Sequence, residues 1–323
     1  MSRGLGDVYK RQGTFSQVNG ISSAVNNFFD PKNQHTVKVL PFLGEYSWSV
    51  VIASLVLAFC VAAVLIGGVK RIASVSQIIV PFMAVIYIVF VLVLVVCNIT
   101  AVPAAFATIV KAAFSPKAIT GGAVGSFLVA MQKGVARGIF SNEAGLGSAP
   151  IAAAAAQTKE PVRQGLVSMT GTFIDTIVIC TLTGLSIVLT GAWQVDGLEG
   201  VQVTTYAFQN GLPLPKELSA FVLMLCLVFF AFTTILGWDY YSERCLEYLS
   251  GGRMKYVKVY RWIYILAVFI GPYMTVSAVW TIADIFNGLM ALPNMIALFA
   301  LSGVVVKETR HFFERHRNGE IED

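Results

Sequence analysis

A short polar run stands out in a chain that is otherwise mostly apolar. Residues 136–150 read ARGIFSNEAGLGSAP and combine a cation at Arg137, a carboxylate at Glu143, a hydroxyl at Ser141 and an amide at Asn142. Within a membrane, ionisable groups face a cavity or pair with each other, and they mark ion and solute sites. The run therefore indicates a binding site rather than an ordinary loop.

Three glycines in this run predict a break in a helix. Gly138, Gly145 and Gly147 accept backbone conformations that other residues avoid, so we expect a helix that is broken near Ser141–Gly147. Half-helix ends expose N–H groups that attract a carboxylate and carbonyl groups that suit Na⁺. We expect Ser141 and Asn142 to cap the second half-helix.

The charged residues beside the break have several possible roles. Glu143 can neutralise Arg137, form a gate or take part in cation coupling, and we favour the ion pair. The spacing of Gly134 and Gly138 also fits plain helix packing. Asp175 is a further polar group at span depth, for which we expect an interhelical hydrogen bond.

The rest of the chain indicates an all-α polytopic membrane protein. Apolar residues make up 56% and charged residues 13%, against about 25% charged in soluble domains. A bilayer-spanning helix needs about 20 apolar residues, whereas no segment alternates like a strand of a membrane barrel. Seven segments qualify as spans: Trp48–Gly68, Ala73–Cys97, the interrupted Gly122–Gln157, Leu166–Leu189, Leu218–Tyr240, Trp262–Trp280 and Ile285–Val306.

The basic residues predict the orientation of these spans. Thirteen Lys and Arg residues follow the odd-numbered spans: Lys70, Arg71, Lys159, Arg163, Arg244, Arg253, Lys255, Lys258, Arg261, Lys307, Arg310, Arg315 and Arg317. The opposite loops hold Lys111, Lys117 and Lys216. Basic loops stay in the cytoplasm, so we expect a cytoplasmic C-terminus. The net charge of +5 reflects this topology and does not imply nucleic acid.

Several stretches resemble one transporter family. The run GIFSNEAGLGSAPIAAAAAQT at 138–158 closely resembles the signature of the alanine or glycine:cation symporters. The same family is resembled, in the same order, by GGVKRIASVSQIIVPFMAVIY (67–87), FIDTIVICTLTGLSIVLTG (173–191), FAFTTILGWDYYSERCLEYL (230–249) and FNGLMALPNMIALFALSGVV (286–305). The resemblance implies a LeuT-type fold of two five-helix inverted repeats, and uptake of alanine or glycine coupled to Na⁺ or, in some members, H⁺.

The resemblance also implies a division of the chain. The seven spans correspond to core helices four to ten, and Gln17–Ser22 to the end of helix three. The family's earlier broken helix and two further helices have no counterpart here, so we interpret the chain as N-terminally truncated. Residues 1–12 are interpreted as a non-native segment, residues 13–306 as the transporter domain and residues 307–323 as a cytoplasmic tail.

Candidate binding residues follow from the resemblance. Those for the substrate are Gly138, Phe140, Ser141, Asn142, Gly145, Gln17 and Asn19. Thr233 and Thr234 are the candidates for Na⁺, although a membrane Thr hydroxyl often bonds a carbonyl one turn back in its own helix.

The sequence thus predicts a secondary active transporter in the cell membrane, and not an enzyme. We expect a small neutral amino acid as substrate, Na⁺ as coupling ion with H⁺ possible, and no organic cofactor or nucleic acid. The choice between alanine, glycine and serine stays open, as does the oligomeric state. The alternatives are a related cation-coupled symporter for another small solute and an inactive fragment.

Overall fold

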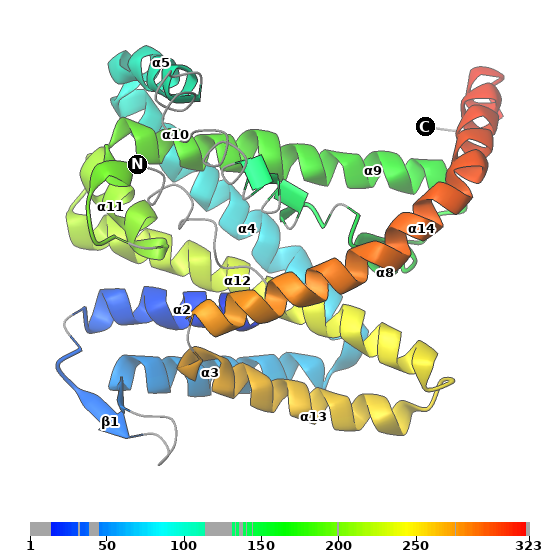
Figure 1. Ribbon diagram of the computed structural model, residues 1–323, viewed down its shortest axis with the longest axis horizontal. Coiled ribbons are helices and arrows are strands. Elements are labelled where there is room, and N and C mark those ends of the chain that lie inside the picture. The colour runs from blue at the N-terminus through cyan, green and yellow to red at the C-terminus, as the bar shows by residue number, and fades with distance from the viewer. Residues whose placement is uncertain are drawn as a thin grey trace.

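The computed structural model describes residues 14–31, 33–38, 45–113, 131–132, 134–135, 138–139, 141–143, 145–198, 200–274 and 276–320. This part of the chain is mostly helical (Figure 1). The α-helices are α2 (Thr14–Phe29), α3 (Trp48–Leu65), α4 (Gly68–Cys97), α5 (Val102–Ala113), α8 (Ala149–Ala153), α9 (Pro161–Phe173), α10 (Thr181–Leu189), α11 (Val201–Gly211), α12 (Lys216–Leu249), α13 (Met254–Ile270) and α14 (Val276–Arg317). Shorter elements are the π-helix η2 (Ile174–Cys180), the 3₁₀ turns η1 (Ile99–Ala101), η3 (Ala192–Gln194) and η4 (Gly271–Tyr273), and the strands β1 (Thr36–Lys38) and β2 (Glu45–Ser47).

Five helical stretches in the described residues are long and apolar enough to cross a bilayer. They are Trp48–Leu65, Gly68–Cys97, Pro161–Leu189, Lys216–Leu249 and Ile285–Arg317. Many of their large apolar side chains are exposed, as lipid-facing residues are. These stretches match five of the seven predicted spans. The third predicted span, Gly122–Gln157, is described only in part, because residues 122–130 and several later positions lie outside the described residues.

The predicted sixth span, Trp262–Trp280, is wrong in its boundaries. The helix α13 begins eight residues earlier, at Met254, and ends at Ile270. Gly271 and Pro272 follow in a 3₁₀ turn, because proline has no N–H to donate to the preceding turn of the helix. Basic residues at the start of α13 obscured its true beginning, since their long stems can lie along a helix with the charge outside.

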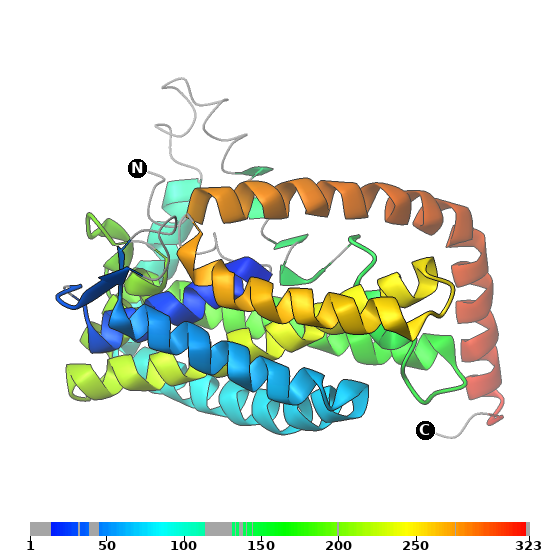
Figure 2. The same ribbon diagram turned by 90° about the horizontal axis from the view of Figure 1, so that it is seen from below.

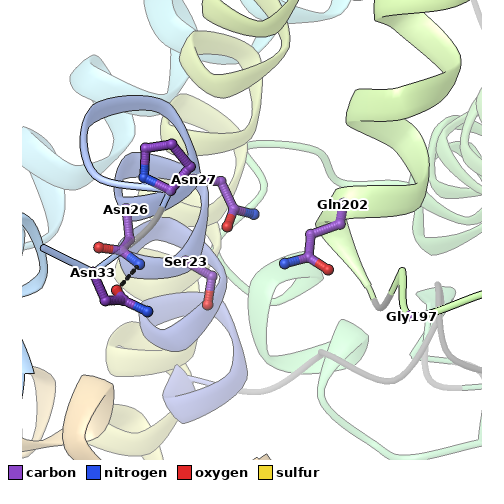
Figure 3. Close-up of a pocket in the computed structure, with 7 residues that line it drawn as sticks. Ser23, Asn26, Asn27, Asn33, Gly197 and Gln202 are labelled. Carbon is purple, nitrogen blue, oxygen red and sulfur yellow. Dashed lines mark hydrogen bonds between the residues drawn. The ribbon is translucent and has the colours of Figure 1, made fainter.

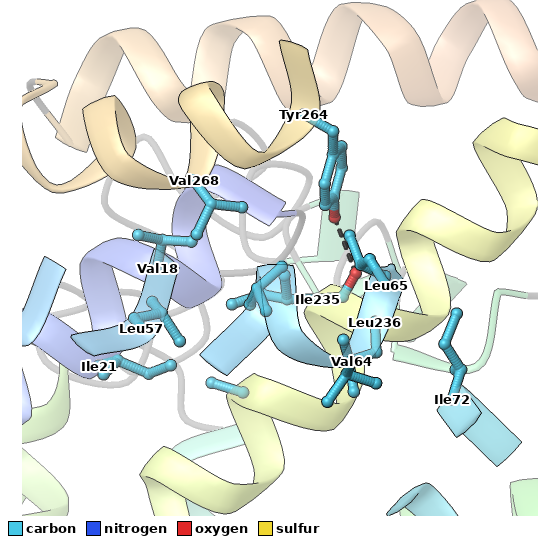
Figure 4. Packing of buried hydrophobic residues seen from close by; sticks show 12 residues of the cluster. Val18, Ile21, Leu57, Val64, Leu65, Ile72, Ile235, Leu236, Tyr264 and Val268 are labelled. Carbon is cyan, nitrogen blue, oxygen red and sulfur yellow. Dashed lines mark hydrogen bonds between the residues drawn. The ribbon is translucent and has the colours of Figure 1, made fainter. Parts of the chain in front are cut away.

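One apolar cluster joins five helices (Figure 4). Its members are Val18 and Ile21 of α2, Leu57, Val61, Val64 and Leu65 of α3, Ile72 of α4, Ala231, Ile235 and Leu236 of α12, and Tyr264 and Val268 of α13. Lipid tails are as apolar as these side chains, so the cluster stabilises the bundle through close packing rather than through exclusion of water. A second cluster joins α4, α11 and α12 around Phe208.

A small hairpin docks onto the end of this bundle. The strands β1 and β2 pair antiparallel, with Thr36 opposite Ser47. The Tyr46 hydroxyl donates to the carbonyl oxygen of Tyr273 at 2.8 Å, and the Tyr273 hydroxyl lies 2.7 Å from Ser54 Oγ of α3. The hairpin is thus tied to both η4 and α3.

The last helix extends beyond the predicted span. The helix α14 continues through Arg317, so residues 307–317 of the predicted tail are helical. The helix α14 bends, so that its C-terminal part, drawn in red, runs in a different direction from its first part, drawn in orange (Figure 2). Arg315 Nη1 lies 3.0 Å from Glu160 Oε1, just before α9, which ties this end of α14 to the bundle.

Candidate functional site

The expected interruption is present in the polar run. Residues 142, 143 and 145–148 are not helical, and α8 begins only at Ala149. Glu143, Gly145 and Gly147 all have left-handed backbone conformations, with φ of 52°, 78° and 82°. Such conformations suit glycine but cost roughly 1–2 kcal/mol for a residue with a Cβ. The helix is therefore interrupted at the residues that predicted a break.

The prediction that Ser141 and Asn142 cap the second half-helix is wrong. The residue before α8 is Ser148, and no side chain caps this helix. Ser141 Oγ instead donates to Asp175 Oδ2 at 2.5 Å, and Asn142 Nδ2 donates to the Gly138 carbonyl oxygen at 3.1 Å. The intervening turn separates both residues from α8, so their side chains bond elsewhere.

A π-helical turn holds the start of the break. Asp175 and Thr176 lie in η2, between α9 and α10. Thr176 Oγ1 donates to Asn142 Oδ1 at 2.8 Å, beside the bond from Ser141 to Asp175. A π-helix shifts side-chain directions relative to an α-helix and is frequent at functional sites. The expected interhelical bond of Asp175 is present, but its attachment to the polar run was not foreseen.

A central cavity of about 240 Å³ lies beside these contacts. Its polar lining residues are Gln17 of α2, Ser141, Asp175, Tyr87 of α4, Thr183 of α10 and Thr204 of α11. The Tyr87 and Thr183 hydroxyls lie 2.6 Å apart, and Met83 and Phe230 form part of an apolar wall. Six segments thus bring polar groups from distant parts of the sequence into one space.

Only some of the predicted substrate residues line this cavity. Gln17 and Ser141 do, whereas Asn142 and Gly145 lie in the turn and are not among its lining residues. Asn19 is also buried. It lies two residues after Gln17, which rotates it by about 200° around α2. Its side-chain oxygen accepts a hydrogen bond from Ser23 Oγ at 3.5 Å.

The remaining two candidates, Gly138 and Phe140, are not among the described residues that line this cavity. Gly138 supplies its carbonyl oxygen to Asn142. Phe140 lies outside the described residues.

A second cavity of about 300 Å³ contains both Na⁺ candidates. Thr233 and Thr234 line it together with Glu143, Trp238 and Tyr241. Each Thr hydroxyl donates to a carbonyl of its own helix, Thr233 to Phe230 at 3.0 Å and Thr234 to Phe230 at 2.9 Å. A hydroxyl that donates keeps two lone pairs, so these bonds do not prevent cation binding.

Glu143 joins this second cavity to the break. Its carboxylate accepts from Ser148 Oγ at 2.6 Å and hydrogen-bonds with Tyr241 of α12. The predicted pair with Arg137 cannot be placed, because Arg137 lies outside the described residues. Met83 and Phe230 line both cavities, so the two spaces share a wall.

A third, amide-rich pocket lies near the hairpin (Figure 3). This pocket of about 320 Å³ is lined by Ser23, Asn26 and Asn27 of α2, by Pro31 and Asn33, and by Gly197 and Gln202. Asn26 Nδ2 donates to Asn33 Oδ1 at 2.9 Å. The lining carries no charge. No group of three or more His, Cys, Asp or Glu that could hold a metal ion occurs within the described residues.

Comparison with known proteins matches the chain to one family. The family model described as the sodium:alanine symporter family matches residues 8–323. The chain belongs to this family. Its relatives are transporters and not enzymes, and the five apolar helices identify a multi-pass membrane protein.

Individual relatives cover most of the chain. An uncharacterised transporter of Haemophilus influenzae is 51% identical over 94% of this chain and 62% of its own length. The sodium/alanine symporter AgcS of Methanococcus maripaludis is 48% identical over 83% of this chain and 58% of its own. The probable sodium/glutamine symporter GlnT of Bacillus subtilis is 37% identical over 90% and 59%. The chain therefore spans about three fifths of the length of these relatives.

Proposed function

We propose that this chain forms part of a secondary active transporter that imports a small neutral amino acid, alanine or glycine, together with Na⁺. The observation that supports this proposal is that Gln17, Ser141 and Asp175, from three separate segments, line one cavity of about 240 Å³. This volume is below the roughly 300–1,000 Å³ of sites for drug-sized ligands. A solute of only a few heavy atoms fits it.

The cavity chemistry matches a zwitterion. Asp175 offers a carboxylate to the substrate ammonium group, and the Gln17 carboxamide offers N–H donors to its carboxylate. The Ser141 hydroxyl, which donates to Asp175, keeps lone pairs that can accept from the ammonium group. Met83 and Phe230 limit the space for the side chain. One methylene too many or too few changes the binding free energy by about 1–3 kcal/mol. This wall therefore selects for amino-acid substrates with small side chains.

The second cavity is the proposed Na⁺ site. Na⁺ is a hard cation, and such ions take oxygen ligands; the hydroxyls of Thr233 and Thr234 and the carboxylate of Glu143 supply them. Because Met83 and Phe230 line both cavities, a shift of either side chain caused by one ligand alters the space for the other. This shared wall is a physical route for coupling.

The finer architecture belongs to the same proposal. We infer a LeuT-type bundle in which access alternates around the break at Ser141–Gly147, with core helices four to ten in this chain and the C-terminus in the cytoplasm. The proposed partners are the amino-acid substrate and the lipid bilayer.

A chimera tests the function directly. The matching region of the Methanococcus maripaludis symporter is replaced by this chain, and Na⁺-dependent alanine uptake is measured in proteoliposomes. We expect uptake by the chimera and at least a tenfold rise in KM for alanine in Gln17→Leu, because the cavity loses a buried polar partner that is worth about 1–3 kcal/mol. The control is Gln194→Leu at an exposed position, which should leave KM unchanged.

Two outcomes would contradict the proposal. One is a correctly inserted chimera that transports neither alanine nor glycine. The other is an unchanged KM in Gln17→Leu. Competition by excess glutamine examines the alternative of a different small solute, since one relative is named for glutamine; strong inhibition would favour that alternative.

A further inference from the structure

A buried carboxyl group on α12 lies apart from the cavities described above. Asp239 has no exposed surface, and neither of its carboxylate oxygens has a hydrogen-bond partner among the residues that the structure describes. An ionised carboxylate in such surroundings costs several kcal/mol unless a cation or donors compensate it. The group therefore needs either a positive partner or a proton.

Within the described residues, the cation that acts on Asp239 is Arg261, and it is already engaged. Glu243, one helical turn further along α12 and 1% exposed, accepts two bonds from Arg261 of α13, from Nε at 2.6 Å and from Nη2 at 3.0 Å. This bidentate geometry is the strong form of an Arg–carboxylate pair. Glu243 and Arg261 act on Asp239 with opposite signs, so the pair leaves Asp239 without a counter-charge of its own.

The other groups on α13 that face Asp239 are phenols. Tyr260 and Tyr264 both interact electrostatically with Asp239. The Tyr264 hydroxyl already bonds the Ile235 carbonyl oxygen at 2.7 Å and Thr14 Oγ1 at 2.9 Å. Neither phenol supplies a positive charge.

Among the described residues, the remaining helices packed against α12 supply no buried cation either. The helix α2 lies along α12 and holds no titratable residue between Thr14 and Phe29. Cys60 is the one titratable residue of α3. Lys70 and Arg71 at the start of α4 are exposed, and Glu143 lies in the cavity lined by Trp238 and Tyr241.

We propose that Asp239 is a proton-binding site, whose carboxyl group carries one proton in this conformation. Binding forms an O–H bond at one carboxylate oxygen, takes one proton from solution and removes the negative charge. A proton suits this position better than Na⁺, because a proton needs a single oxygen whereas a hard cation needs several. Release during a transport cycle, when rearrangement of α12 and α13 admits water or Arg261, is an extension that rests on the proposed function.

Infrared spectroscopy of the purified chain in lipid nanodiscs tests the proton directly, without substrate or transport. An ordinary Asp carboxyl has a pKa of about 3.9 and is ionised at neutral pH. The chain with ¹³C-labelled aspartate should nevertheless show an isotope-shifted carboxylic-acid C=O band at neutral pH. Asp239→Asn should remove this band, whereas Asp196→Asn, which changes an exposed carboxyl, should retain it.

The labelled wild-type chain keeps the test decisive even if Asp239→Asn fails to fold. The absence of an aspartic-acid band from the folded wild type would overturn the proposal, as would its persistence in a folded Asp239→Asn variant. Neither result depends on alanine uptake, so failure of this inference is distinct from failure of the proposed function.

Discussion

At the scale of single residues, two adjacent hydrogen bonds hold the start of the broken segment. Ser141 bonds Asp175 at 2.5 Å and Thr176 bonds Asn142 at 2.8 Å. Each bond in a membrane interior contributes only about 0.6 kcal/mol on average. Their value here is geometric, because they fix the direction of Ser141 toward the cavity that it lines.

Replacing Asn142 tests this arrangement. We expect Asn142→Leu in the chimera to reduce Na⁺-dependent alanine uptake by tenfold or more, since the leucine removes the acceptor of Thr176 and leaves a hydroxyl unpaired, at a cost of about 1–3 kcal/mol. Membrane insertion should persist. Asn210→Leu is the matched control, because Asn210 makes the same bond to a carbonyl four residues back at an exposed position. Equal uptake by the two variants would remove Asn142 from the site.

At the scale of elements, the hairpin depends on one carboxylate. Asp30 accepts from Ser47 Oγ at 2.7 Å, from the Gln34 amide at 2.9 Å and from the His35 amide at 3.4 Å. The bond from Ser47, followed by the bond from the Gln34 amide, lowers the pKa of Asp30 below its usual value. Asp30 directly follows α2, and Ser47 directly precedes α3. The hydrogen bond between these two residues therefore connects the end of α2 to the start of α3.

This connection should depend on pH. A lowered folded-state pKa means that the stabilisation is complete above the unfolded pKa of about 3.9 and is lost as the pH falls through the lower folded value. We expect hydrogen-exchange protection of the Gln34 amide, corrected for intrinsic exchange, to fall in that acidic range. In Asp30→Asn the protection should be weak at every pH, whereas Asp196→Asn should behave like the wild type. Protection in Asp30→Asn that still varies with pH would assign the effect to another group.

At the scale of the whole molecule, the orientation in the membrane decides which side each cavity faces. The excess of basic residues after the odd-numbered spans predicts a cytoplasmic C-terminus, and α14 carries the chain from the bundle to Arg317. The hairpin and the amide-rich pocket then face outside.

Cysteine labelling in intact cells measures this orientation. With the five native cysteines replaced by serine, a cysteine at Asn318 should resist an impermeant reagent, whereas one at Lys38 should react. Both positions are exposed. The reverse pattern of labelling would invert the topology.

The membrane class, five of the spans and the break in the polar run could be predicted from the sequence alone. Apolar runs of spanning length and clustered glycines act locally, so composition and spacing are sufficient to reveal them. Gly271 and Pro272 are a local sequence signal for the end of α13. The apolar residues that follow them concealed this signal.

Only the tertiary structure decided which polar residues share a space. Gln17 and Asn19 both carry a carboxamide group and lie two positions apart. The rotation of α2 between them places Gln17 in the cavity lining and leaves Asn19 out of it. The π-helical turn placed Asp175 and Thr176 against Ser141 and Asn142, and packing of α13 on α12 left Asp239 buried beside a completed ion pair. These relations join residues far apart in the chain, and they arise from packing that no local pattern of residues encodes.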